Sequence, residues 1–136
     1  MRLVSVYDVP DAEDILYVLL EQRTPEQSIS HRKMPTLPEH RAFIQSKPYL
    51  AWYLIEEGAQ YVGATYLSQQ REIGIFIFNA HQGRGLGRQA VEMLMRGHPG
   101  EFLANVNPNN ANSRRFWEKL GGRLIQVTYR LNASST

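Results

Sequence analysis

The spacing of apolar and polar residues predicts strands and helices in turn along the first part of the chain. Residues 2–7 alternate between apolar and polar, as a half-buried strand does. After Pro10 the apolar residues recur at helical spacing, and residues 24–35 are then typical of a loop. Thr36 stands three residues before Glu39, which is the pattern of a capping box, so a second helix is predicted to begin there.

Three runs rich in aromatic and β-branched residues occupy the middle of the chain, at 50–55, 61–67 and 73–78. Short polar segments separate these runs, and the pattern predicts three antiparallel strands in series. After the third run, a glycine-rich turn leads into apolar residues at helical spacing over 86–95. The chain thus changes from hairpins to a strand followed by a helix.

The last third of the chain continues the alternation of strands and helices. We expect a buried strand at 102–106, a turn at 107–112, a helix at 113–120, a final strand at 123–131 and a loose tail at 132–136. Strands in series, followed by strands that alternate with helices, predict an α/β fold with a mixed sheet. Because the 136 residues contain no linker and no internal repeat, residues 1–136 are expected to form a single domain.

Composition excludes several classes of protein. Fifteen basic and thirteen acidic residues leave a net charge of +2, which is too small to predict a nucleic-acid partner. The chain has no cysteine and its four histidines lack metal-ligand spacing, so neither a disulfide nor a metal site is expected. No run approaches the roughly 20 apolar residues of a membrane span, and the N-terminus lacks a signal-peptide pattern. We therefore expect a cytoplasmic protein without a membrane partner.

The glycine-rich turn before the helix at 86–95 is the most informative stretch of the sequence. A turn of this kind directs free backbone N–H groups and the positive end of the helix dipole to one point, which suits a phosphate. Glycines let the backbone approach the anion closely. The alternative is that they only make a tight strand-to-helix turn. The residues of the turn are Gln82, Gly83, Arg84, Gly85, Leu86, Gly87 and Arg88.

Two other nucleotide-binding motifs come close to this turn. Residues 85–90 fit the dinucleotide fingerprint G-x-G-x-x-G/A, which predicts a redox cofactor. That fingerprint belongs after the first strand of a βαβ unit, with an acidic residue about 20 positions later. Here the turn follows three antiparallel strands, and the residues around Asn105 are Asn and Pro. The lysine of an NTPase phosphate loop is also missing, which excludes that class.

The turn resembles the Q/R-x-x-G-x-G/A pyrophosphate loop of the GNAT superfamily of N-acetyltransferases. A second stretch, at 110–121, is similar to that family's N-x-x-A-x-x-x-Y-x-k-x-G-F helix, and the two together cover most of residues 72–121. The resemblance implies acetyl-CoA as cosubstrate and an amine as acceptor. It also implies a mostly antiparallel central sheet with helices on both faces and a splayed strand pair that takes the acyl-CoA.

Family positions assign the expected coenzyme contacts. The backbone of Ile75, Phe76 and Ile77 would pair with the pantetheine arm like an added strand, and the N–H groups of 83–88 would hold the pyrophosphate. Asn110 would contact the coenzyme and Trp117 would pack beside its pantetheine end. Two alternatives remain open, since Asn110 also suits a helix cap and the side chains of 75–77 suit a core strand.

The resemblance also suggests catalytic residues. Glu72 stands where related enzymes with an E-I-G-Y-like strand carry a glutamate, and it would act as general base through a water, unless it is only a solvated charge at a strand end. Trp117 occupies the position of the tyrosine that protonates the leaving thiolate, which an indole cannot do. Solvent, or the hydroxyl of Tyr129 or Ser113, would then protonate the thiolate.

The acceptor region resembles the family more loosely. Residues 31–44 have the R-x-x-M and E-H-x-x-F/W pattern of GNAT branches that modify ribosomal-protein N-termini, polyamines or nucleotide-linked amino sugars. On this basis we expect His31, Met34, His40 and Tyr53 to border the acceptor site. The identity of the acceptor stays open between a small-molecule and a peptide amine, and the aromatic residues of this region also suit a core.

The chain departs from the family pattern after the second motif. Gly122 replaces the usual phenylalanine, and only 16 residues follow Leu120, where the family often has two further strands. One strand is then missing or comes from a partner chain, which leaves room for a homodimer. Because the motif tyrosine is absent, a catalytically silent acyl-CoA-binding module is the alternative function.

Overall fold

A computed structural model describes residues 1–23 and 34–133. The described elements run in the order β1 (Arg2–Ser5), the short 3-10 helix η1 (Val6–Asp8), α1 (Ala12–Glu21), α2 (Leu37–Gln45), β2 (Ala51–Glu57), β3 (Gln60–Leu67), β4 (Ile73–Ile77), η2 (Asn79–His81), α3 (Leu86–Gly97) and α4 (Ala111–Lys119). The strands and helices predicted between residues 2 and 95 are therefore confirmed, with shifts of a few residues at their ends. In the part of the chain that the structure describes, no helix is long and apolar enough to cross a membrane.

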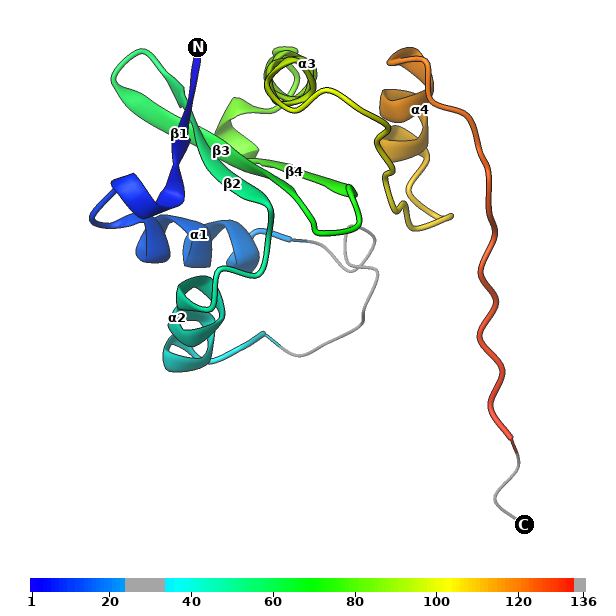
Figure 1. Cartoon of the computed structure of the whole chain (residues 1–136), viewed down its shortest axis with the longest axis horizontal. Coiled ribbons are helices and arrows are strands. Elements are labelled where there is room, and N and C mark those ends of the chain that lie inside the picture. The colour runs from blue at the N-terminus through cyan, green and yellow to red at the C-terminus, as the bar shows by residue number, and fades with distance from the viewer. Residues whose placement is uncertain (24–33, 134–136) are drawn as a thin grey trace.

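The four strands form an antiparallel sheet in the order β1-β2-β3-β4, covered on both faces (Figure 1). Side chains alternate between the two faces along each strand. Leu54, for example, packs with α1 and α2, whereas the adjacent Ile55 packs with α3, and both are fully buried. The mixed α/β architecture expected from the sequence is confirmed, with helices on both faces of a sheet whose described strands pair antiparallel.

In the part of the chain that the structure describes, the outer edge of β4 pairs with another backbone segment at one point only. A parallel bridge joins Glu72 to Leu103, where the Ile73 N–H donates to the Leu103 oxygen at 2.8 Å and the Leu103 N–H donates to the Arg71 oxygen at 2.9 Å. Beyond this bridge the two segments separate. The strand predicted at 102–106 is thus reduced to a single bridge, because its neighbour pairs with it at one residue and then leaves it.

The prediction of a final strand at 123–131 is wrong. This segment contains no strand, and it leaves α4 as an exposed trace that runs beyond the sheet (Figure 1). Its residues have the alternation of a strand, but among residues 1–23 and 34–133 no backbone hydrogen bond pairs it with another segment. Alternation predicts a conformation and a buried face, and it does not supply the partner that a strand requires.

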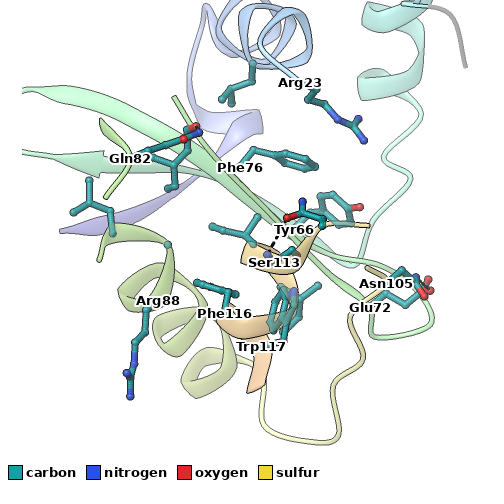
Figure 2. A pocket seen from close by; sticks show the side chains of 18 of the residues that line it. Arg23, Tyr66, Glu72, Phe76, Gln82, Arg88, Asn105, Ser113, Phe116 and Trp117 are labelled. Carbon is teal, nitrogen blue, oxygen red and sulfur yellow. Dashed lines mark hydrogen bonds between the residues drawn. The ribbon is translucent and has the colours of Figure 1, made fainter. Parts of the chain in front are cut away.

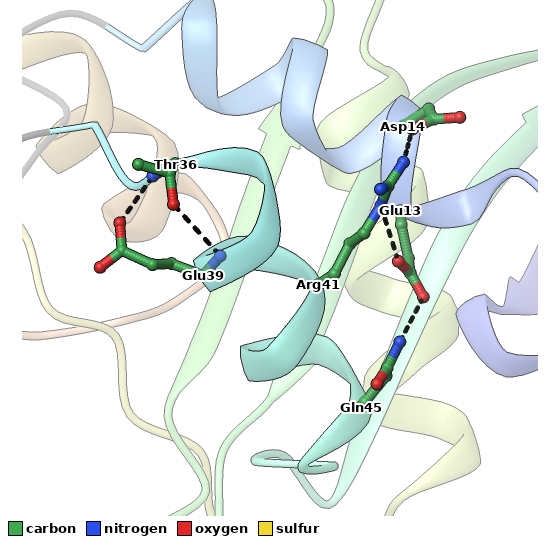
Figure 3. A network of polar contacts seen from close by, with 6 residues as sticks. All are labelled: Glu13, Asp14, Thr36, Glu39, Arg41 and Gln45. Carbon is green, nitrogen blue, oxygen red and sulfur yellow. Dashed lines mark hydrogen bonds and ion pairs between the residues drawn. The ribbon is translucent and has the colours of Figure 1, made fainter.

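Helices α1 and α2 pack through apolar side chains and add a rim of polar contacts (Figure 3). Arg41 pairs with Glu13 and with Asp14, each at 3.4 Å, and the Gln45 amide donates to Glu13 at 3.4 Å. Such exposed pairs contribute little to stability, typically below about 1 kcal/mol. The burial of Leu16, Leu19 and Ile44 holds the two helices against the sheet, and the polar rim orients them.

The capping box predicted at the start of α2 is confirmed (Figure 3). The Thr36 hydroxyl accepts from the Glu39 N–H at 3.3 Å, and the Thr36 N–H donates to the Glu39 carboxylate at 2.9 Å. This second bond lowers the pKa of Glu39, so the carboxylate is ionised at neutral pH and the box is complete.

We expect Thr36→Ala to lower the free energy of unfolding by about 1 kcal/mol, because it removes the side-chain oxygen of the cap. Thr36→Ser keeps that oxygen and should stay within about 0.5 kcal/mol of the wild type. Urea unfolding at pH 7 measures both variants. Equal losses in the two would show that the methyl group of Thr36, and not its hydroxyl, supports the helix.

Candidate functional site

A pocket of about 1030 Å³ lies along the open side of β4. It is bordered by the glycine-rich turn, the start of α3, Asn105 and one face of α4, and it reaches past Phe76 to the end of α1 (Figure 2). Gln82 and Arg88 stand toward one end and Glu72 and Asn105 at the other. Most of the residues predicted for coenzyme binding therefore meet in one cavity.

The glycine-rich turn leaves the N-terminus of α3 without a cap. Gly83 and Gly85 have φ of 80° and 74°, a left-handed conformation that other residues rarely adopt. Gly85 is the N-cap residue and offers no side chain, and the first helical N–H bond that follows it runs from Gln89 to the Gly85 oxygen. The N–H groups of residues 86–88 thus have no helical acceptor and are directed out of the helix end.

The side chains of the turn are engaged in the turn itself or in surface pairs. Gln82 donates to the Ile77 oxygen at 3.1 Å and to the Asn79 side chain at 3.3 Å, which braces the link from β4 to the turn. Arg84 bonds Glu57 at 3.0 Å and does not line the pocket, whereas Arg88 lines the pocket and pairs with Glu92 at 2.9 Å. The backbone is consequently the main source of unused donors at this end of the pocket.

Strand β4 presents three different surfaces. Ile75 and Ile77 pack on the α3 side, and Phe76 packs on the α1 side. The N–H of Ile73 is directed to the outer edge, and backbone groups alternate between edges, so Ile75 and Ile77 direct theirs outward as well. The Gln82 amide donates a hydrogen bond to the Ile77 oxygen, whereas the backbone groups of Ile75 have no partner on that edge among the described residues.

The α1 side of the pocket is aromatic. Tyr49 and Tyr66 stack with ring centroids 4.0 Å apart, and Gly74 makes room for this arrangement, since a Cβ there would lie 2.0 Å from the Tyr66 ring. Burial raises the pKa of both tyrosines, so both hydroxyls remain protonated at neutral pH. Arg23 reaches over Phe76 at 4.9 Å from the ring centroid (Figure 2). Its Nε is buried without a hydrogen-bond partner among the described residues.

Glu72 is held by two side chains at one end of the pocket. The Ser68 hydroxyl donates to one carboxylate oxygen at 3.2 Å and accepts from the Glu72 N–H at 3.0 Å. The Asn105 amide donates to the other oxygen. Glu72 is half-buried, so this carboxylate has a fixed orientation while it retains access to water.

Helix α4 forms the far wall. Asn110 caps it, with its side-chain oxygen accepting from the Ser113 N–H at 3.0 Å, so the cap interpretation of Asn110 is correct, and the residue also lines the pocket. Phe116 and Trp117 face the pocket with their rings edge to face, 4.9 Å apart. An added Cβ at Gly87 would lie 3.5 Å from Phe116, so α4 packs close to the glycine-rich turn.

Several predicted residues lie elsewhere. His40 is only 3% exposed and its ring packs beside Tyr17, and burial lowers its pKa, so it is a neutral packing residue between α1 and α2. Tyr53 shares a hydrogen bond with His98 at 2.8 Å, packs on the α3 face of the sheet and does not line the pocket. The resemblance placed these side chains by sequence position, and it did not fix which face of a helix or strand they occupy.

Two further predicted residues do not line the pocket, and a third cannot be described. Met34 is exposed and does not line the cavity. Tyr129, expected as a proton donor, is 82% exposed on the unpaired C-terminal segment. His31 lies outside the described residues. Conversely, Arg23, Tyr49 and Asn105 line the pocket although no motif marks them.

Within residues 1–23 and 34–133, no group of three or more His, Cys, Asp or Glu side chains is arranged to hold a metal ion.

The fold and the pocket together define an acyltransferase of the GNAT type. The sequence model of the Acetyltransferase (GNAT) family matches residues 14–122, and the chain belongs to this family. Membership supports acetyl transfer from acetyl-CoA. No curated protein matches the chain with significant sequence similarity.

Solved structures of acetyltransferases resemble this chain in fold. An acetyltransferase from Thermus thermophilus shares 24% identity at a TM-score of 0.72, with 92% of this chain and 88% of that chain covered. The yncA protein of Salmonella typhimurium, solved with its cofactor acetyl-CoA, shares 20% identity at a TM-score of 0.65, with 88% and 76% covered. A ribosomal-protein-alanine N-acetyltransferase from Brucella melitensis shares 18% identity at a TM-score of 0.65, with 88% and 82% covered. At these identities the likeness shows the fold.

We expect Gly74→Ala to lower the free energy of unfolding by about 1 to 3 kcal/mol, because the new methyl group must displace the Tyr66 ring. In a Tyr66→Ala background the same change should cost less than about 0.5 kcal/mol, since the ring is gone. Urea unfolding of the two single variants and the double variant gives the coupling between them. Gly97→Ala, at a glycine with open space around it, is the control for the substitution itself. Additive effects would mean that Gly74 is not required by the tyrosine.

Proposed function

We propose that this chain is an N-acetyltransferase that moves the acetyl group of acetyl-CoA directly to a primary amine of a small molecule, a nucleotide sugar or a protein. The observation that carries the proposal is the meeting, in one pocket, of an uncapped helix N-terminus and the unpaired edge of β4. The first suits a pyrophosphate and the second suits an extended amide-bearing arm.

The residues present fit acetyl-CoA. The N–H groups of residues 83–88 would hold the pyrophosphate, and the glycines there leave no Cβ to keep it at a distance. The outward oxygen of Ile75 and the outward N–H of Ile77 would pair with the pantetheine amides, and Phe116 and Trp117 would cover the apolar side of the pantetheine. The coenzyme supplies the acetyl group as a reactive thioester.

The proton-handling groups lie at the other end of the pocket. Glu72, oriented by Ser68 and Asn105, would take the proton of the ammonium through a water. The Ile75 N–H, unused on the outer edge, would stabilise negative charge on the carbonyl oxygen. The hydroxyls of Ser113 and Tyr66 line the pocket, and they, with solvent, replace the tyrosine that the family motif carries at position 117.

The aromatic side of the pocket indicates which class of acceptor would fit there. Tyr66, Tyr49 and Phe76 form a flat apolar wall, and Arg23 places a positive charge over it. A buried guanidinium nitrogen without a partner is costly and is satisfied by an oxygen acceptor. This favours an amine that carries a carboxylate, phosphate or carbonyl oxygen nearby, which includes amino acids and peptide N-termini.

A catalytically silent acyl-CoA-binding module is the second candidate, and Trp117 at the tyrosine position favours it. Release of free coenzyme A thiol with a panel of amines separates the two. Binding of acetyl-CoA without turnover on any amine would support the module.

Acetyl-CoA should raise the thermal midpoint of the protein, because it binds the folded state only. Gly87→Asp should abolish this shift by placing a carboxylate where the phosphate belongs, while Gly97→Asp, at the other end of the same helix, should preserve it. Differential scanning fluorimetry with and without acetyl-CoA measures both. A folded Gly87→Asp variant that kept the full shift would rule out the turn as the pyrophosphate site.

Glu72→Gln should lower kcat/KM by about 10² to 10⁴ at pH 7, since the amine is then almost wholly ammonium and general-base help is lost. The activity should recover as the pH rises toward the pKa of the amine. Trp117→Phe should retain most of kcat, because the indole does not transfer protons. pH–rate profiles of both variants test this, with Glu101→Gln as the control for loss of one acidic charge. An inactive Trp117→Phe beside an unaffected Glu72→Gln would refute this division of roles.

A further inference from the structure

Arg71 has a backbone conformation that disfavours any residue with a side chain. It lies in the turn from β3 to β4 with φ of 63°, and its N–H donates to the Ser68 oxygen at 3.0 Å. Glycine or asparagine is usual at such a position, because a Cβ crowds the following carbonyl oxygen. A long charged side chain at this position indicates that its contacts outweigh the strain.

The guanidinium group of Arg71 binds the link that follows α3. Its Nε donates to the Glu101 oxygen at 2.7 Å, and its Nη2 donates to the His98 oxygen at 2.5 Å. The group also lies over the Phe102 ring, 4.6 Å from the centroid. Gly100 leaves space for it, since a Cβ there would lie 2.8 Å from Nη2. One side chain therefore fastens this link to the β3–β4 turn.

The same attachment determines where the link meets β4. The Arg71 oxygen accepts from the Leu103 N–H at 2.9 Å, next to the bridge that Leu103 forms with Glu72. Two residues further along, the Asn105 amide donates to the Glu72 carboxylate (Figure 2). The backbone and the side chain of Arg71 together bring Asn105 within reach of Glu72.

Few other contacts hold this link. Within residues 1–23 and 34–133, the hydrogen bonds of residues 99–104 involve only Arg71 or the N–H of Ile73. Phe102 is half-buried and Leu103 is exposed, so apolar packing adds little. The position of the link therefore depends on Arg71.

We propose that Arg71 is a positioning residue, which fixes the link after α3 so that Asn105 orients the Glu72 carboxylate. The inference rests on the proposed role of Glu72 as general base. Arg71 is absent from the residues that line the pocket, so it acts through Asn105 and not by contact with a substrate. A misplacement of about 1 Å in a reacting group can cost about 100-fold in rate, so the anchor of the base bears directly on turnover.

The first test measures the link without any substrate. Arg71→Gly removes the guanidinium and makes the left-handed turn favourable, so its effect reports the lost contacts and not strain. Hydrogen exchange followed by NMR should show the Leu103 and Ile73 N–H groups exchanging at least about 10-fold faster. The Phe78 N–H, which donates to β3 at the other end of β4, is the internal reference. Unchanged exchange at Leu103 and Ile73 would overturn the proposal, whether or not the protein has transferase activity.

Lys47→Gly is the matched control. Lys47 is also a cation in a left-handed conformation, with φ of 52°, and it does not line the pocket. This variant should leave both the exchange of the Leu103 N–H and kcat within about twofold of the wild type. A Lys47→Gly variant that reproduced the effects of Arg71→Gly would overturn the proposal, because the effects would then come from any such turn.

The second test separates positioning from stability, and it uses a competent amine. Arg71→Gly should lower kcat by about 10- to 100-fold while the KM of acetyl-CoA stays within about threefold, because the base moves and the coenzyme contacts remain. In a Glu72→Gln background the same change should lower kcat by less than about twofold, since no base is left to orient. Equal losses in both backgrounds, or a loss confined to KM, would overturn the proposal.

Asn105→Ala tests the intermediate step. It should lower kcat by a factor similar to that of Arg71→Gly, and the two changes combined should add less than about twofold to either one. Additive losses would overturn the route through Asn105. Absence of wild-type turnover on any amine would count against the proposed function, and the exchange of the Leu103 N–H would still decide whether Arg71 holds the link.

Discussion

The separation of β4 from residues 104–106 is the constraint on which the rest of the structure depends. Within residues 1–23 and 34–133, the backbones of the two segments pair only at the bridge between Glu72 and Leu103. Buried backbone groups are nearly always paired, so an edge left open beside a pocket calls for a ligand or water to satisfy it. The position of Glu72 follows from the same feature, since it stands at the point where the two segments are still joined, at one end of the pocket.

One five-residue strand serves three purposes because its side chains and its backbone face in different directions. Ile75 and Ile77 fix β4 to α3, which carries the glycine-rich turn at its start. Phe76 and the space left by Gly74 shape the aromatic wall on the other face. The outer backbone edge remains available for the proposed coenzyme. Rigid packing on both faces keeps that edge in place, which is what a preorganised site requires.

The features that could be predicted from the sequence are those whose signals are local. The capping box of Thr36, the hairpin strands and the glycine-rich turn each need only a few neighbouring residues, and the structure contains all three. The face on which a side chain lies was not predictable in the same way. The surroundings of His40 and Tyr53 depend on how α2 and β2 are rotated against their neighbours, and neither residue lines the pocket. The prediction of a strand at 123–131 was wrong for a different reason, because the sequence pattern describes a strand and says nothing of which segment pairs with it.

The sparse packing of α4 has a consequence for how the protein holds a ligand. A helix with no buried residue opens at a free energy well below that of the whole fold, so its order is set by the few surfaces that touch it. Phe116 and Trp117 belong both to the wall of the pocket and to the apolar face of the helix. A molecule bound there is in effect part of the hydrophobic core. Part of its binding free energy is spent on ordering the helix, so its affinity and the local stability of α4 rise and fall together.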